Sequence, residues 1–144
     1  MGATLFNPKQ VQFIQTNRVA RLATANQAGE PHVVPICYAF DGECFFSPID
    51  EKPKRLDPSR LRRVRNVKSN PRVSFVIDHY SDDWSELRFL IVEGTATVLE
   101  QAGDRFDALE LLRIRYEQYR SMVLEERPLL VIQPLSVVEW GFVG

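Results

Sequence analysis

The pattern of apolar and polar positions predicts strands that are linked by hairpins and by single helices. Runs rich in β-branched and aromatic residues are typical of strands. They occupy six segments, at residues 19–25, 32–40, 43–47, 72–79, 87–99 and 129–140, and Gly94 is a candidate β-bulge in the fifth. The pattern predicts an α+β fold with a mainly antiparallel sheet, and it leaves open whether that sheet closes into a barrel.

Three further segments carry helix signals. Asn7 and Gln10 form a capping box around Pro8, so a helix is expected from Pro8 to about Asn17. The second helix is expected between the Asp-Pro pair at 57–58 and the Asn-Pro pair at 70–71, and the third from about residue 104. Their apolar stripes are Leu61, Val64 and Val67 in the second helix, and Phe106, Leu109, Leu112, Tyr116 and Tyr119 in the third.

An Asp-Gly pair at 41–42 separates two of the strand runs and is a strong hairpin signal, because both central residues of such a turn need positive φ. A two-residue turn would place Phe40 opposite Glu43 and Ile36 opposite Ser47. The apolar surface at Ile36 and the hydroxyl of Ser47 are therefore predicted to meet across the hairpin.

The two cysteines, Cys37 and Cys44, would lie diagonally across that hairpin. Diagonal neighbours are about 7–8 Å apart, which is too far for a disulfide. We expect both as small buried residues in a reducing compartment, and a reactive thiol is the alternative.

Composition bounds the class of protein. Apolar residues make up 44% of the chain and charged residues 26%, as in an ordinary globular protein, so residues 1–144 are expected to form a single domain. The sequence shows neither a signal peptide nor an apolar run of membrane length, which predicts a soluble, cytoplasmic protein.

One segment is strongly basic, although the net charge of the chain is only −1. Residues 51–72 contain nine Lys or Arg and two Asp or Glu, a local charge of +7. Such a segment suits an anion, and the alternative is a solvated helix face. Nucleic acid is disfavoured as the anion, because aromatic residues do not interleave with these charges.

Motifs for metal and nucleophile chemistry are missing from the sequence. The two histidines, His32 and His79, lie on different predicted strands without a metal-ligand spacing, so no metal is expected. Gly-x-Ser-x-Gly, Walker and Gly-x-Gly-x-x-Gly motifs do not occur. If the protein is an enzyme, a bound cofactor supplies the reactivity.

Several motifs follow one another in a recognisable order. They are PHVVP at 31–35, the Asp-Gly hairpin, FFS at 45–47, a lysine loop, the helix end RNVKSNP at 65–71 and VSFV at 73–76. This order resembles the pyridoxamine 5'-phosphate oxidase-like split-barrel family over nearly the whole chain. Within it, DEKPK at 50–54, RNV at 65–67 and DHYSDDW at 78–84 resemble a small subgroup that depends on a deazaflavin, coenzyme F-420.

The resemblance implies a six-stranded split β-barrel that binds FMN or coenzyme F-420 and forms a homodimer with cofactor clefts at the interface. In such proteins the cofactor ring lies against the second strand, a hydroxyl ends the third, and basic residues hold the phosphate. The matching positions are Val34, Pro35, Ile36 and Cys37 for the ring, Ser47 for the hydroxyl, Lys52 and Lys54 for the phosphate, and Trp84 and Trp140 near the cleft. Alternatives stay open: Ser47 as a strand end, Lys52 as a solvated residue, and both tryptophans as packing residues.

The activity that the resemblance implies is hydride transfer to or from a small organic substrate by a flavin-type cofactor. The alternative is a non-catalytic flavin- or haem-binding carrier on the same barrel. Vitamin B6 oxidation is not expected, because the sequence after Trp140 lacks the arginine and histidine segment of the larger oxidases. No catalytic residue is assigned, and water or Tyr80 would supply a proton.

Replacing Lys52 and Lys54 together by alanine is expected to weaken binding of FMN much more than binding of riboflavin, which lacks the phosphate. The reason is that an ammonium group holds a phosphate as a mobile point charge. Fluorescence titration gives both dissociation constants. An equal loss for the two ligands would show that the loop acts structurally.

Overall fold

A computed structural model of the chain describes residues 5–50 and 61–142. In this part, seven strands form one antiparallel sheet in the order β2-β1-β5-β6-β7-β4-β3. The strands are β1 (Ala20–Ala25), β2 (Pro31–Ile36), β3 (Ala39–Phe40), β4 (Phe45–Pro48), β5 (Arg72–His79), β6 (Arg88–Leu99) and β7 (Leu129–Trp140). The helices are α1 (Pro8–Thr16), α2 (Arg62–Ser69) and α3 (Phe106–Arg115), with shorter 3₁₀ turns η2 (Trp84–Glu86), η3 (Ala102–Arg105) and η4 (Glu117–Ser121).

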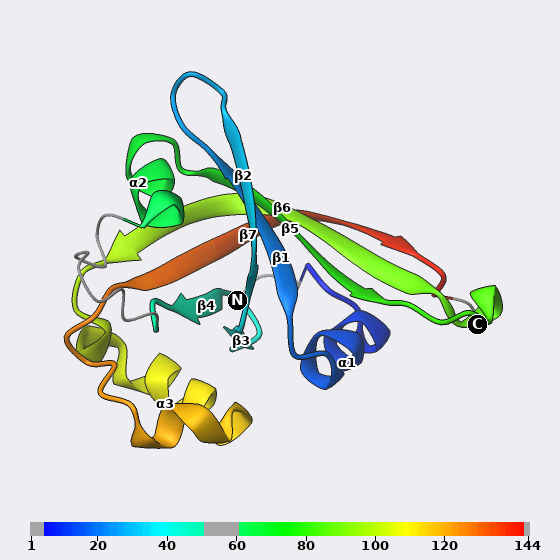
Figure 1. Ribbon diagram of the computed structural model, residues 1–144. Helices are drawn as coiled ribbons and strands as arrows, with labels where there is room; N and C mark the ends of the chain where they lie inside the picture. The colour runs from blue at the N-terminus through cyan, green and yellow to red at the C-terminus, as the bar shows by residue number, and fades with distance from the viewer. Residues whose placement is uncertain (1–4, 51–60, 143–144) are drawn as a thin grey trace.

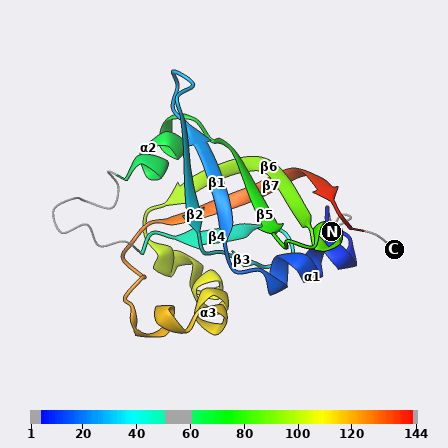
Figure 2. The same ribbon diagram turned by 45° about the vertical axis from the view of Figure 1, so that its right-hand side comes forward.

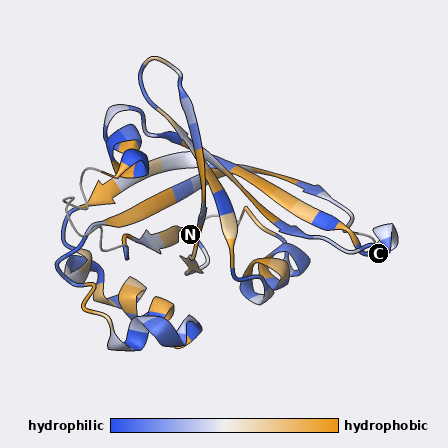
Figure 3. Cartoon of the chain, in the orientation of Figure 1, coloured by the Kyte–Doolittle hydropathy of each residue, from blue (hydrophilic) through white to orange (hydrophobic). Residues whose placement is uncertain are grey.

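The curled antiparallel sheet with its helices confirms the predicted α+β class and the split-barrel architecture. Figures 1 and 2 show α2 beside the upper end of β1 and β2, whereas α1 and α3 lie towards the opposite end. Apolar residues run along β6 and β7 and along one side of α1 and α3 (Figure 3). The helices therefore cover the open parts of the sheet with their apolar faces.

The predicted strand at 32–40 is interrupted at Cys37 and Tyr38, so the sheet has seven strands rather than six. The Tyr116 hydroxyl takes the place of a neighbouring strand, because it lies 3.0 Å from both the N–H and the carbonyl oxygen of Tyr38. The Tyr38 hydroxyl in turn contacts two carbonyl oxygens at the end of α1, those of Ile14 and Asn17, at 2.7 and 2.8 Å. The N–H group of Tyr38 therefore keeps a partner at the break.

Helix α1 begins as predicted. The Asn7 side chain accepts a hydrogen bond from the Gln10 N–H at 2.8 Å, and the Gln10 side chain accepts one from the Asn7 N–H at 2.9 Å. This confirms the capping box. Phe13 and Ile14 then anchor the helix in the main core of the sheet.

The predicted register of the 41–42 hairpin is wrong by two residues. Phe40 pairs with Phe45, and residues 41–44 form a longer loop. The Asp41 carboxylate causes the difference, because it accepts hydrogen bonds from the N–H groups of Glu43 and Cys44 at 2.8 and 2.7 Å. Ser47 consequently does not face Ile36.

The third predicted helix is divided. The chain passes through η3 before α3 begins, leaves the helix at Tyr116, and continues into η4. The predicted stripe is buried at its last four positions, Leu109, Leu112, Tyr116 and Tyr119, but Phe106 is 59% exposed. The prediction for Phe106 is wrong because this residue stands at the start of α3, before the helix contacts the sheet.

Helix α2 ends as predicted but begins later than predicted, at Arg62, with Leu61 as its extended N-cap. Its predicted start at 57–58 lies outside the described residues. The helix ends at Ser69 with Asn70 as its C-cap, as expected, and Val64 and Val67 are buried. Leu61 is partly buried against the same core.

A β-bulge lies beside Gly94 as predicted, but on β7 rather than on β6. Glu93 pairs with Ser136 whereas Gly94 pairs with Pro134, so Leu135 is the extra residue on β7. A Cβ atom at Gly94 would overlap the carbonyl oxygen of Gln133. The close approach of β6 and β7 at this point therefore requires glycine.

Gly94→Ala is expected to lower the free energy of unfolding by about 2 kcal/mol, since the backbone of β7 has to move away from the added methyl group. Gly103→Ala is the comparison: its Cβ would lie 3.3 Å from the Glu125 Cβ, which has to move by only a few tenths of an ångström, so we expect a smaller change than for Gly94→Ala. Urea unfolding of both variants at one protein concentration measures the difference. Similar values for the two variants would contradict a tight β6–β7 contact.

Candidate functional site

A cavity of about 150 Å³ lies where the end of β2 meets β4, α2 and η4. Its lining residues are Val19, Pro35, Ile36, Cys37, Ser47, Pro48, Asp50, Arg63 and Tyr119. Four of the nine residues predicted for the cofactor site, Pro35, Ile36, Cys37 and Ser47, therefore come together. Val34 packs against the main core and does not line the cavity. Lys52 and Lys54 lie outside the described residues.

Ser47 joins the two strands that form this cavity. Its buried hydroxyl donates a hydrogen bond to the carbonyl oxygen of Cys37 at 2.8 Å, and its backbone pairs with Leu130 of β7. This bond closes the gap that the interrupted strand leaves at Cys37. The hydroxyl oxygen keeps its lone pairs for a ligand that donates a hydrogen bond.

Arg63 places a positive charge in the wall of the cavity although its side chain is only 5% exposed. Asn66, three residues later on α2, donates a buried hydrogen bond to the Thr24 hydroxyl at 3.0 Å and so fixes the helix on β1. The neighbouring His32 has a lowered pKa, because of its partial burial and of the charges of Arg62 and Arg63. This end of the cavity is therefore suited to an anion.

Sequence reasoning treated the arginines of 51–72 as one field and did not single out Arg63. The helical period is the signal that separates them, since positions 63, 66 and 67 share the buried side of α2. Arg62 and Arg65 point to solvent. Lys68 pairs with Glu100 at 2.7 Å, as a solvated helix face would.

Cys37, Asp50 and Tyr119 form a group of titratable side chains between this cavity and the next. The Tyr119 hydroxyl donates a hydrogen bond to the Asp50 carboxylate at 2.7 Å, and burial together with that carboxylate raises the pKa of Tyr119. Burial also raises the pKa of the Cys37 thiol. Both groups are therefore protonated at neutral pH, which supports a packing role for Cys37 rather than a reactive thiolate.

A larger cavity of about 740 Å³ shares Val19, Cys37, Asp50 and Tyr119 with the first. Three guanidinium groups line its far side. Each is held by backbone carbonyl oxygens: Arg18 by that of Arg115, Arg115 by those of α1, and Arg120 by those of Arg113 and Ile114. These bonds fix the positive charges around the cavity before any ligand enters.

The predicted tryptophans do not reach the cavity of their own chain. Trp84 is 71% exposed, and Trp140 is 51% exposed and stacks on Phe89 with 5.9 Å between ring centroids. Ser47 pairs with Leu130, ten residues before Trp140 on β7, which corresponds to about 30 Å along a strand. Figure 1 shows the end of β7 far from β4 and α2.

An apolar groove of about 540 Å³ crosses the outer face of the sheet between β2 and β6. It is lined mainly by Ala23, Val33, Val76, Phe89 and Ile91. Within residues 5–50 and 61–142, no group of three or more His, Cys, Asp and Glu side chains could hold a metal ion. No helix of that part is long and apolar enough to span a membrane.

Comparison with known proteins agrees with this geometry. The profile of the family described as pyridoxamine 5'-phosphate oxidase matches residues 6–141. The chain belongs to this family. A 5a,11a-dehydrotetracycline/5a,11a-dehydrooxytetracycline reductase of Streptomyces rimosus subsp. rimosus is 30% identical over 140 residues, which are 96% of this chain and 85% of the reductase.

Solved structures of other proteins share the fold. HutZ, a heme storage protein of Vibrio cholerae, is 19% identical with a TM-score of 0.71 over 94% of both chains. An F420 reductase is 22% identical with a TM-score of 0.63, over 88% of this chain and 94% of that protein.

Arg63→Gln is expected to weaken FMN binding about tenfold or more and to leave riboflavin binding nearly unchanged, because a charge-assisted bond to the phosphate is lost. Arg65→Gln is the matched control, because Arg65 lies two residues further along α2 and on its exposed side. This variant should change neither dissociation constant. Equilibrium titration of both flavins measures the effect. Unchanged FMN affinity in Arg63→Gln would remove Arg63 from the phosphate site.

Proposed function

We propose that this protein is an oxidoreductase that uses a flavin-type cofactor, FMN or the deazaflavin coenzyme F-420, to move a hydride to or from a small organic substrate. One observation carries the proposal: Pro35, Ile36 and Cys37 line a cavity together with Ser47 and the buried Arg63. This places apolar surface, a hydroxyl and a positive charge within one site, in a member of the pyridoxamine 5'-phosphate oxidase family.

The residues present fit such a cofactor. The edge of β2 at Pro35 and Ile36 supplies apolar surface for a ring system, and Arg63 supplies charge for a phosphate. Lys52 and Lys54 follow Asp50 closely in sequence and would add two ammonium groups. The cofactor, when bound, would supply the hydride chemistry, and the protein would orient it and exclude water.

We further propose a homodimer in which each chain completes the cofactor cleft of the other. The cavity of about 150 Å³ is smaller than the roughly 300–1,000 Å³ that ligand sites usually offer. The exposed Trp84 and Trp140 are too far from Ser47 of their own chain to extend this cavity. They would instead extend the cavity of the second copy. The apolar groove at Val33 and Val76 offers the contact surface for that copy.

The cavity of about 740 Å³ is the proposed substrate site, because it adjoins the cofactor cavity at Cys37 and Tyr119. Its three arginines outnumber the two acidic residues of its lining, Asp50 and Glu117, and so favour an acidic or enolic substrate. Tyr119, rather than the exposed Tyr80, holds a proton at the junction of the two cavities. The reductase from Streptomyces rimosus supports reduction of an unsaturated compound as the reaction class.

Cysteine labelling tests the placement of the cofactor. Cys37 lines the proposed ring site, whereas Cys44, a thiol whose pKa is also raised by burial, lies on the hairpin loop. Bound FMN or coenzyme F-420 is expected to slow iodoacetamide alkylation of Cys37 about tenfold and to leave Cys44 unchanged. Mass spectrometry of the two peptides reads both rates in one sample, and equal rates with and without cofactor would overturn the ring position.

Turnover separates the enzyme from a carrier. The reduced form of the bound cofactor should be reoxidised, without oxygen, by an unsaturated acidic substrate such as a conjugated enone carboxylate. Tight binding of a flavin or of haem with no transfer in either direction would instead identify a non-catalytic carrier, as the fold shared with HutZ allows.

A further inference from the structure

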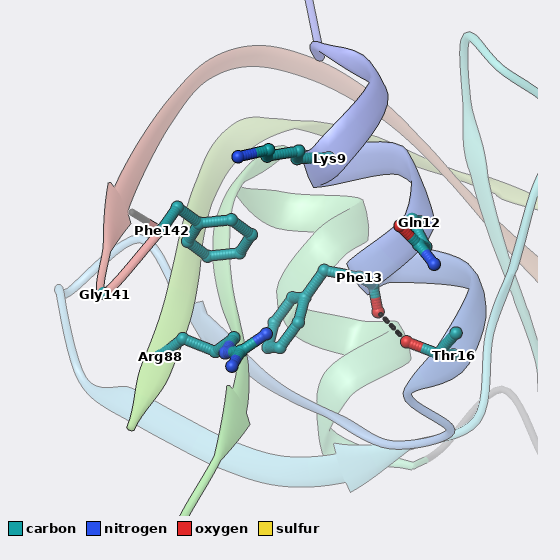
Figure 4. Close-up of a pocket in the computed structure, with 7 residues that line it drawn as sticks. All are labelled: Lys9, Gln12, Phe13, Thr16, Arg88, Gly141 and Phe142. Atoms are coloured by element: carbon teal, nitrogen blue, oxygen red, sulfur yellow. Dashed lines mark hydrogen bonds between the residues drawn. The ribbon is translucent and has the colours of Figure 1, made fainter. Parts of the chain in front are cut away.

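A further cavity, of about 370 Å³, lies between α1 and the last residues that the structure describes. Lys9 and Phe13 approach it from α1, and Arg88 and Phe142 approach it from the ends of β6 and β7. Figure 4 shows the two phenyl rings between the side chains of Lys9 and Arg88. Successive residues of a β-strand point to opposite faces. Arg88 therefore lies on the opposite face of β6 from Phe89, whose ring stacks on that of Trp140.

The backbone at Gly141 forms one wall of this cavity. Gly141 has a φ of +84°, and a Cβ atom there would overlap the carbonyl oxygen of Leu87. Only glycine allows this close turn. It directs Phe142 back onto α1, where its ring meets that of Phe13 edge to face with 5.0 Å between centroids.

Arg88 supplies a guanidinium group to the cavity, and no carboxylate is among the described residues that line it. The nearby Glu139 accepts a hydrogen bond from Gln10 on another side of α1. A guanidinium group beside two aromatic rings suits a ligand with an apolar, planar body and a negative end.

We propose that this cavity binds a small aromatic carboxylate, at a site separate from the cofactor and substrate cavities of the same chain. The Arg88 guanidinium pairs with the carboxylate, whose two oxygens match its planar fork. The rings of Phe13 and Phe142 contact the aromatic body. Ser47 pairs with Leu130 at the other end of β7, so the two sites lie at opposite ends of the strand.

Titration with 2-naphthoate tests the proposal. Calorimetry should give a dissociation constant below about 1 mM, with a shift of the Gly141 amide resonance in NMR spectra. Arg88→Gln should weaken binding about tenfold. Arg72→Gln is the matched control, because Arg72 is an exposed arginine at the other end of β5 and β6, and it should change nothing.

Three results would overturn the site. The first is equal binding of 2-naphthoate by Arg88→Gln and by the unchanged protein. The second is equal binding of the neutral 2-naphthalenemethanol, which keeps the rings and lacks the charge. The third is displacement of 2-naphthoate by FMN, which would place the ligand in the cofactor cavity.

Discussion

The contact between the Tyr116 hydroxyl and the backbone of Tyr38 is the interaction on which the rest of the site depends. It satisfies the N–H group that a strand neighbour would otherwise pair. The chain can therefore leave β2 at Ile36 and re-enter the sheet as β3. That break frees the Cys37 carbonyl to accept the hydrogen bond from Ser47, which brings an apolar strand end and a hydroxyl to one cavity.

The basic segment shows why composition alone left two interpretations open. The residues of one helix differ. Lys68 pairs with Glu100 at the surface, where such a pair stabilises little. Arg63 is instead buried in the wall of the cavity. Burial of one position, rather than the total charge, thus separates Arg63 from the solvated basic residues of the same helix.

Local signals predicted the elements that depend on neighbours in sequence: the capping box of α1, the limits of β5 and β7, and the bulge at Gly94. The hairpin register was missed because the Asp41 side chain competes with a two-residue turn, and the dipeptide pattern does not report that bond. The bond between Tyr119 and Asp50 joins positions 69 residues apart. No periodicity in the sequence contains it, so the inner wall of the site could not be predicted.

The strands β6 and β7 are so long that their two ends contribute to different parts of the molecule. A pair of twelve-residue strands extends about 40 Å when straight, so residues at one end cannot serve a site at the other. Ser47 and Arg63 stand at one end, and the stacked rings of Phe89 and Trp140 stand at the other. An exposed stacked pair costs free energy in a lone chain. A second copy, placed so that this end meets the small cavity, would bury the rings and enlarge the site in one contact.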